Sequence, residues 1–214
     1  TMASLQADII PATLWLLTFG ALAVWAQEII AAFTRRSYRR IAVGALSYLT
    51  VPILLWIFFS QVSLSETGML VKALLSLLIV APAGPILYRL VYRPIANAPV
   101  LVLLILSVAV HISLVGIGLL MFGPEGYRAQ PFTSSSITLG GVMISSQSLM
   151  VLFIAIALMV ALYLFFDFSM YGKALRATAF NRSGAQLVGV PTSLAGSTSF
   201  FLASFIGACS GLLI

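Results

Sequence analysis

The chain consists of long apolar stretches separated by short polar ones. Continuous apolar runs of about 20 residues, without the alternation typical of half-exposed strands, predict helices that cross a bilayer. Six such runs occur, at Pro11–Phe33, Ile41–Phe59, Met69–Val91, Val100–Phe122, Leu149–Phe166 and Leu194–Ile214. The pattern predicts an all-α fold, a polytopic transmembrane helical bundle of about six spans, because in lipid only helices and closed barrels satisfy the backbone.

The composition is that of an integral membrane protein with one domain, residues 1–214. Hydrophobic residues make up 61% of the 214 residues and charged residues only 7%, against about 25% charged in soluble domains. The formal charge of +6 does not indicate nucleic acid, because Lys and Arg form no long patch. We expect a multi-pass protein of the cell inner membrane that contacts lipid and no nucleic acid.

The cations gather in alternate gaps between the predicted spans. With six spans of alternating direction, one side of the membrane receives Arg35, Arg36, Arg39, Arg40, Arg89, Arg93, Lys173, Arg176 and Arg182. The positive-inside rule assigns this side to the cytoplasm. The N-terminus is then outside, and the basic segment 171–191 faces the cytosol. The Ser/Thr-rich stretch Pro131–Gly141 lies on the opposite side, as an exposed loop or an interfacial turn.

The segment 171–191, YGKALRATAFNRSGAQLVGVP, separates the fifth and sixth apolar runs. It is too polar to cross a bilayer, and its alanines and Leu175 favour helix. Ser169 is a suitable N-cap for a first short helix, and Asn181 followed by Arg182 is a suitable end. The pattern therefore indicates structure in this segment and argues against a slack linker.

A second, very short helix is expected directly after the first. Ser183 can cap this helix, Gly189 can end it in the left-handed conformation, and Pro191 prevents its continuation. The two helices then meet at a cytosolic corner that exposes the apolar pair Leu187 and Val188 beside cations. Such a knob suits docking into a groove on another protein.

Three runs of residues point to a known family. They are LYRLVYRPIANAPVL at 87–101, LMFGP at 120–124 and RATAFNRSGAQLVGV at 176–190. In this order and spacing they resemble permease subunits of branched-chain amino acid ABC transporters, the high-affinity uptake systems for leucine, isoleucine and valine. In the last run, the positions that match the family's cytoplasmic loop are Arg176, Ala177, Asn181, Ala185, Leu187, Gly189 and Val190. The resemblance covers about 87–211, whereas residues 1–68 diverge from the family's usual first spans.

The resemblance implies a permease subunit of an ABC importer that translocates branched-chain or related small amino acids; urea or an amide stays an open alternative. It also implies a second permease subunit, two cytosolic ATPase subunits and an extracytoplasmic solute-binding protein. Because family members continue with further spans beyond the sixth, the chain is expected to be truncated at its C-terminus. The residues assigned to the ATPase-coupling loop are Arg176, Ala177, Asn181, Arg182, Ala185, Leu187, Val188 and Gly189.

The chain is expected to use ATP without binding it. No Gly-x-x-x-x-Gly-Lys-Ser/Thr phosphate loop occurs in the sequence, so the partner subunits would bind the ATP. With one histidine, one cysteine and five carboxylates on separate spans, no metal site, no catalytic residue and no cofactor of its own is expected. The chain is predicted to be a transport subunit and not an enzyme.

Three positions are candidates for the translocation pathway. His111 lies in the middle of the fourth span, where an ionisable group is usually functional. The alternative for His111 is a neutral imidazole bonded to a neighbouring helix. Pro82 and Pro85 interrupt the third span and predict a kink, which is either a substrate-facing bend or ordinary packing.

Glu28 lies near the cytoplasmic end of the first span, where it is expected to pair with Arg35 or Arg36. Two other functions stay open at this point. One is a non-transporting or truncated membrane scaffold subunit. The other, which is less favoured, is an intramembrane enzyme that uses His111 with Glu28.

Overall fold

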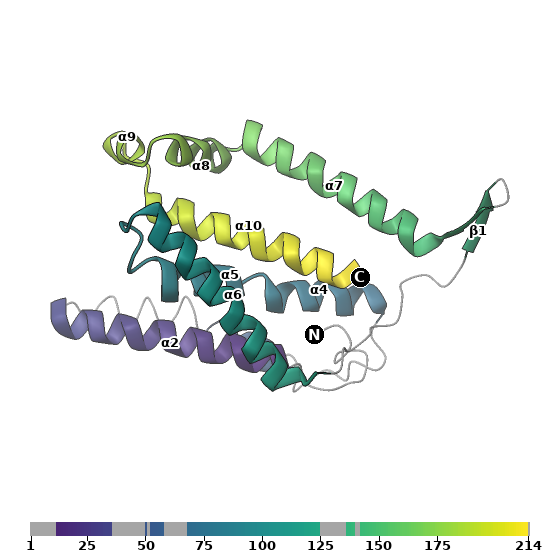
Figure 1. The fold of residues 1–214 in the computed structure, drawn as a ribbon, viewed down its shortest axis with the longest axis horizontal. Coiled ribbons are helices and arrows are strands. Elements are labelled where there is room, and N and C mark those ends of the chain that lie inside the picture. The colour runs from purple at the N-terminus through teal and green to yellow at the C-terminus, as the bar shows by residue number, and fades with distance from the viewer. Residues whose placement is uncertain are drawn as a thin grey trace. The chain divides into compact units, whose positions relative to one another are not determined.

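The computed structural model describes residues 12–35, 50, 52–57, 68–124, 136–139 and 142–213 (Figure 1). The helical stretches in this part that are long and apolar enough to cross a membrane are Ala12–Ile30, Met69–Tyr92, Val100–Phe122, Ser146–Phe168 and Thr192–Leu213. They agree with all the predicted spans but one and confirm an all-α polytopic fold. The remaining span, Ile41–Phe59, lies mostly outside the described residues. Within it, residues 52–57 are described and are helical.

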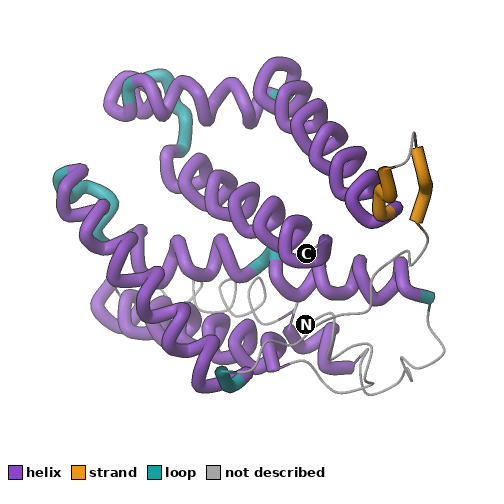
Figure 2. The backbone as a smooth tube through the Cα atoms, turned by 45° about the vertical axis from the view of Figure 1, so that its right-hand side comes forward, coloured by secondary structure: helices purple, strands orange, loops and turns teal. Residues whose placement is uncertain are grey.

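The chain divides into two compact units, Thr1–Ala129 and Gln130–Ile214. The first contains α2 (Ala12–Arg35), α4 (Met69–Val80), α5 (Ala83–Leu87), the π-helix η2 (Tyr88–Tyr92) and α6 (Val100–Phe122). The second contains β1 (Ser136–Leu139), β2 (Val142–Ser145), α7 (Ser146–Phe168), α8 (Met170–Phe180), α9 (Arg182–Leu187) and α10 (Thr192–Leu213). Figure 2 shows that the described parts are mostly helix, with the two strands directly before α7.

The core of the first unit lies between α2 and the third span, which comprises α4, α5 and η2. Leu14 and Ile79 share one cluster of buried apolar side chains, and Ala21 and Ile86 share the next. Residue numbers rise together along both elements, so the two run parallel. This direction is expected of the first and third spans in a chain that crosses a membrane alternately.

The third span is interrupted where the sequence predicts a break. α4 ends before Pro82 and α5 begins after it, because the nitrogens of Pro82 and Pro85 cannot donate to the helical ladder. The backbone of Pro82 stays in the right-handed region, with φ −67° and ψ −16°. The span then continues as η2. Arg93 N, directly after η2, donates a hydrogen bond of 2.8 Å to Tyr88 O. The sequence pattern predicts the break and does not predict the π-helix.

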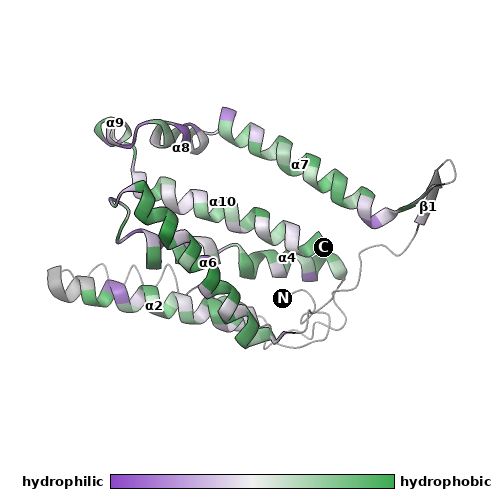
Figure 3. Cartoon of the chain, in the orientation of Figure 1, coloured by the Kyte–Doolittle hydropathy of each residue, from purple (hydrophilic) through white to green (hydrophobic). Residues whose placement is uncertain are grey.

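The helices α6 and α7 are mostly apolar along their length (Figure 3). Neither helix has a residue that is buried within the described part of the chain. Each helix has 23 residues, which is about 34 Å at about 1.5 Å per residue, enough for a hydrocarbon core of about 30 Å. A helix that is hydrophobic all round is buried in lipid or against other protein.

A β-hairpin corrects the prediction for Pro131–Gly141. The described residues of this stretch form β1, which pairs antiparallel with β2 in the register Ser136↔Ser145. Both strands contain apolar and β-branched side chains, and Gly140–Gly141 stands between them in the sequence. Two such runs separated by a glycine pair favour a hairpin over an irregular loop. Ser145 ends the hairpin and caps α7 by accepting a hydrogen bond of 3.3 Å from Gln147 N.

Candidate functional site

The corner formed by α8 and α9 begins at a well-formed cap. Ser169 Oγ accepts hydrogen bonds from Tyr171 N at 3.2 Å and from Gly172 N at 3.5 Å. These bonds satisfy amide groups that have no partner in the first turn of a helix. α8 then continues to Phe180, and both its predicted cap and its predicted end near Asn181 are confirmed.

The cap of α9 differs from the prediction. Asn181, and not Ser183, is the N-cap, and its Oδ1 accepts a hydrogen bond of 2.9 Å from Gly184 N. The physical reason is backbone conformation, because Asn181 is the extended residue between the helices, with φ −148° and ψ 100°, whereas Ser183 already lies inside α9. Gly184 leaves room for this cap, since a Cβ at that position would lie 3.2 Å from Asn181 Cγ.

The end of α9 is a Schellman motif. Val190 N donates to Ala185 O at 2.9 Å, and Gly189 N donates to Gln186 O at 3.0 Å. Gly189 has φ +85°, a conformation that glycine adopts without a steric penalty. The predicted left-handed glycine is therefore confirmed. Hydrogen bonds at both ends hold this helix of six residues in place, although it is too short to be stable alone.

The fixed corner separates buried from exposed positions. Ala185 is buried, at 4% relative exposure, whereas Leu187 is 89% exposed and Val188 is 79% exposed. Phe180, which the sequence analysis did not single out, is 95% exposed at the end of α8. Ala177 is also exposed. The structure thus exposes apolar side chains at the corner, and we call Phe180, Leu187 and Val188 together the knob.

Two polar contacts connect the corner to the helices on either side. Arg176 Nη1 on α8 lies 2.9 Å from Asp167 Oδ1 at the end of α7. Gln186 Nε2 on α9 donates a hydrogen bond of 3.0 Å to Thr192 Oγ1 at the start of α10. Neither contact was predicted from the sequence. The sequence shows only that each pair has complementary polar groups on either side of a predicted helix boundary.

A pocket of about 260 Å³ lies beside the corner, between α8 and the first turns of α10. Most of the residues that line it are apolar, among them Met170, Leu175, Val190 and Leu194. The pocket and the knob share Val188. The corner therefore presents both a projecting and a concave apolar surface.

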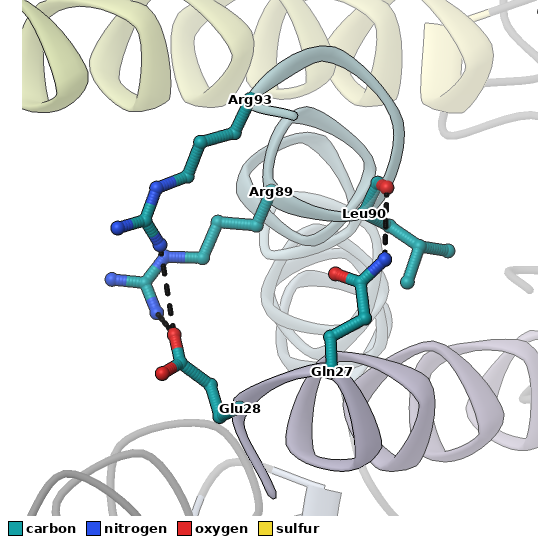
Figure 4. Close-up of polar contacts among 5 residues, drawn as sticks. All are labelled: Gln27, Glu28, Arg89, Leu90 and Arg93. Atoms are coloured by element: carbon teal, nitrogen blue, oxygen red, sulfur yellow. Dashed lines mark hydrogen bonds and ion pairs between the residues drawn. The ribbon is translucent and has the colours of Figure 1, made fainter. Parts of the chain in front are cut away.

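A second polar cluster lies in the first unit, where α2 meets η2 (Figure 4). Glu28 Oε1 lies 3.4 Å from Arg89 Nη1 and 3.5 Å from Arg93 Nη1. Beside it, Gln27 Nε2 donates a hydrogen bond of 3.2 Å to the carbonyl of Leu90. The expected partners of Glu28, Arg35 and Arg36, lie outside the side chains that the structure describes, so that pairing stays a prediction. Of the partners in the described part, Arg89 lies in the third span and Arg93 directly follows it.

The comparison with protein families identifies the class of membrane protein to which the chain belongs. The model of the family described as branched-chain amino acid transport system, permease component, matches residues 40–214. The chain belongs to this family. The match includes all three runs on which the resemblance was based and extends upstream to residue 40. No curated protein and no solved structure gives a match.

The permease carries its pathway candidates on two different spans. His111 is exposed on α6, and in the described part of the chain no hydrogen bond or ion pair joins it to Glu28. Pro82 and Pro85 lie at the interruption of the third span. The roles of these three residues in translocation stay predictions. Within the described residues, no three side chains of His, Cys, Asp or Glu come together to hold a metal ion.

Proposed function

We propose that this permease component is a subunit of an ABC importer for branched-chain or related small amino acids in the cell inner membrane. Separate cytosolic ATPase subunits dock on the corner formed by α8 and α9 and drive the membrane helices. The observation that carries the proposal is the knob, a set of exposed apolar side chains at the ends of α8 and α9.

Exposure of the knob has a physical cost that docking would remove. Leu187 is 89% exposed, and burying a leucine side chain stabilises an interface by about 1.5 to 3 kcal/mol. The caps at Asn181 and Gly189 hold the corner in one conformation, which lowers the entropy lost on binding. A preorganised apolar projection with cations on the same segment has the properties of a docking element.

The other subunits are those that membership of this family implies. Because the sequence has no phosphate loop, ATP would be bound by the ATPase subunits. The spans α6 and α7 have no buried residue in the described part, which fits contact with lipid and with a second permease subunit. An extracytoplasmic solute-binding protein would deliver the amino acid.

The test compares two exposed leucines. The chain is purified with ABC ATPase subunits of the same genome that accompany branched-chain permeases, as wild type, as Leu187→Ala and as Leu120→Ala. Leu120 is 87% exposed on α6 and is distant from the corner in the sequence. Leu120→Ala therefore controls for the general effect of removing an exposed apolar side chain. We expect Leu187→Ala to weaken ATPase binding about tenfold or more, since about 1.4 kcal/mol corresponds to a factor of ten.

Charge removal should have a smaller effect than apolar truncation. Arg182→Ala removes a cation of the corner, and exposed ion pairs contribute only about 0 to 1 kcal/mol. Its effect on ATPase binding should resemble that of added salt. Wild-type binding by the Leu187→Ala protein, at equal membrane insertion, would contradict docking at the knob. Uptake of labelled leucine, compared with labelled urea in the same proteoliposomes, then assigns the substrate class.

A further inference from the structure

A single residue connects the spanning helix α7 to the docking corner. α7 ends at Phe168 and α8 begins at Met170, with Ser169 between them. Ser169 N donates to Phe165 O at 3.1 Å, and Ser169 Oγ caps α8. These bonds lie close to the joint. A change in the angle between the two helices therefore alters their lengths only slightly.

The Asp167 and Arg176 pair acts on the same angle from further away. Arg176 lies about two turns, or roughly 10 Å, along α8 beyond Ser169. Its Nη1 nevertheless reaches Asp167 Oδ1 at 2.9 Å, so the long side chain of Arg176 extends back and bridges the joint between α7 and α8. A contact at this distance from the joint responds more strongly to a change in the angle of α8 than the cap does, because a given change in angle moves Arg176 further than Tyr171.

The packing at the joint is consistent with a fixed angle. Gly172 is buried, and a Cβ there would overlap Phe165 O and lie 2.7 Å from Phe166 Cα. α8 therefore approaches the backbone of α7 more closely than any other residue type would permit. At the far end of the corner, Gln186 bonds to Thr192, so α9 is joined to α10 as well.

We propose that Asp167 is a positioning residue for transport: through Arg176 it holds the docking corner at a fixed angle to α7, so that movement of the knob is passed to this span. The inference rests on the proposed function, because it assigns a mechanical role within the same docking site. Arg176 then acts on the position of the corner through its contact with Asp167.

The energetics determine which measurement can detect this role. The side chains of Arg176 and Asp167 are 53% and 37% exposed, and ion pairs of this exposure contribute little to stability. Loss of the pair through Asp167→Asn should therefore leave insertion, thermal stability and ATPase binding nearly unchanged. It should increase the range of angles between α7 and α8 and lower the number of substrate molecules transported per ATP hydrolysed.

The first experiment measures the angle directly and needs no partner. Spin labels are attached to cysteines at Met159 and Ala179, which are exposed on α7 and α8, in a Cys209→Ala background. Asp167→Asn and Arg176→Gln should each broaden the distribution of label distances. The charge swap of Asp167→Arg with Arg176→Asp should narrow it again. Lys173→Gln is the control, since Lys173 is an exposed cation on α8 without an ion pair to any described residue.

The second experiment measures coupling in proteoliposomes that contain the ATPase subunits. The transport per ATP should fall about two- to fivefold in each single variant, because a contribution of up to about 1 kcal/mol corresponds to about fivefold. It should recover in the charge swap and stay largely intact in Arg176→Lys, which keeps the charge. Added salt should lower the ratio of the wild type toward that of the variants.

The outcomes separate this inference from the proposed function. An unchanged distance distribution and an unchanged transport ratio in Asp167→Asn, together with normal ATPase binding by the wild type, would overturn the positioning role alone. The positioning role would also be overturned if Lys173→Gln lowered the transport per ATP as much as Asp167→Asn does. It would likewise be overturned if the charge swap and Arg176→Lys both had a transport per ATP as low as that of the single variants. Failure of the wild type to bind the ATPase would overturn the proposed function and, with it, this inference.

Discussion

Glu28 of α2 and Arg89 of η2 form an ion pair at 3.4 Å although they are 61 positions apart in the chain. The same carboxylate oxygen lies 3.5 Å from Arg93. The π-helix between Tyr88 and Tyr92 makes a wider turn than an α-helix, and Arg89 and Arg93 reach the carboxylate from opposite ends of it. One carboxylate therefore balances two guanidinium groups at the end of the broken span.

Glu28→Gln should destabilise the first unit by about 1 kcal/mol, at the upper end of the range for exposed ion pairs because the Glu28 side chain is only 22% exposed. The substitution keeps the shape of the side chain and leaves two cations close together. The expected result is a decrease in the melting temperature of about 2 to 4 °C in detergent. Thermal unfolding of the wild type and the variant at low and high salt is the measurement.

A background without the arginines provides the control for this prediction. In Arg89→Gln with Arg93→Gln, the additional change Glu28→Gln should have little effect, because the interaction is already absent. A loss of the same size in both backgrounds would assign the effect of Glu28 to something other than these two arginines.

Gly20 should tolerate no side chain without an adjustment of its neighbour. A Cβ at this position would lie 2.9 Å from Ile86 Cγ2, in the apolar cluster where α2 packs on the third span. Overpacking of a core typically costs about 1 to 3 kcal/mol. We expect Gly20→Ala to lower the melting temperature and Gly20→Val to lower it further.

The second variant for this contact removes the methyl group that Gly20 faces. Ile86→Leu lacks the branch at Cβ, so Gly20→Ala should be less harmful in the Ile86→Leu background than in the wild type. The double-mutant cycle measures this interaction directly. Strictly additive effects would show that the contact with Ile86 does not limit the size of residue 20.

The boundaries of the spans follow closely from the sequence because lipid leaves the backbone few options. α6 begins and ends at the residues that the apolar run predicts, Val100 and Phe122, since Pro99 precedes it and Gly123, with φ +75°, ends it. The partners of Glu28 were not predictable in the same way. They depend on which helix packs against α2, and hydropathy does not encode that choice.

The docking corner shows the same division between local and distant effects. Ser169 and Gly189 were predicted correctly because a cap and a left-handed glycine depend on the nearest residues. The wrong cap, Ser183 in place of Asn181, arose because both residue types suit an N-cap and only the backbone conformation distinguishes them. Asp167 was missed as a partner of Arg176 because a contact across the joint depends on the angle between α7 and α8, which the local sequence does not encode.

Gly172→Ala should disrupt the joint between α7 and α8. The new Cβ would overlap Phe165 O and lie 2.7 Å from Phe166 Cα, and backbone atoms cannot move aside as a flexible side chain can. α8 would have to shift away from α7. We expect a marked loss of ATPase binding and transport, and a broadened distribution of the spin-label distances between α7 and α8.

Gly207→Ala is the matched control for Gly172→Ala. Gly207 lies in α10, and a Cβ there would meet no atom of the described chain within 4 Å. Alanine also has a higher helix propensity than glycine, by about 1 kcal/mol. The control should therefore be neutral or slightly stabilising. Similar behaviour of the two variants would show that the approach of Gly172 to the backbone of α7 is not required.

The orientation of the permease can be tested with two serines on either side of α7. Ser136 on β1 and Ser183 on α9 are exposed, and α7 between them is long enough to cross a membrane. α8 has only 11 residues and is too short to cross a bilayer, which needs about 20. The two serines should therefore lie on opposite sides of the membrane.

The distribution of cations predicts which side each serine occupies. In a Cys209→Ala background, Ser183→Cys should be shielded from an impermeant thiol reagent in intact cells, whereas Ser136→Cys should react. After permeabilisation both cysteines should react, which controls for burial. The reverse pattern in intact cells would place the knob outside the cell. A cytosolic ATPase could then not reach Leu187, so this labelling pattern would contradict both the orientation and the proposed docking site.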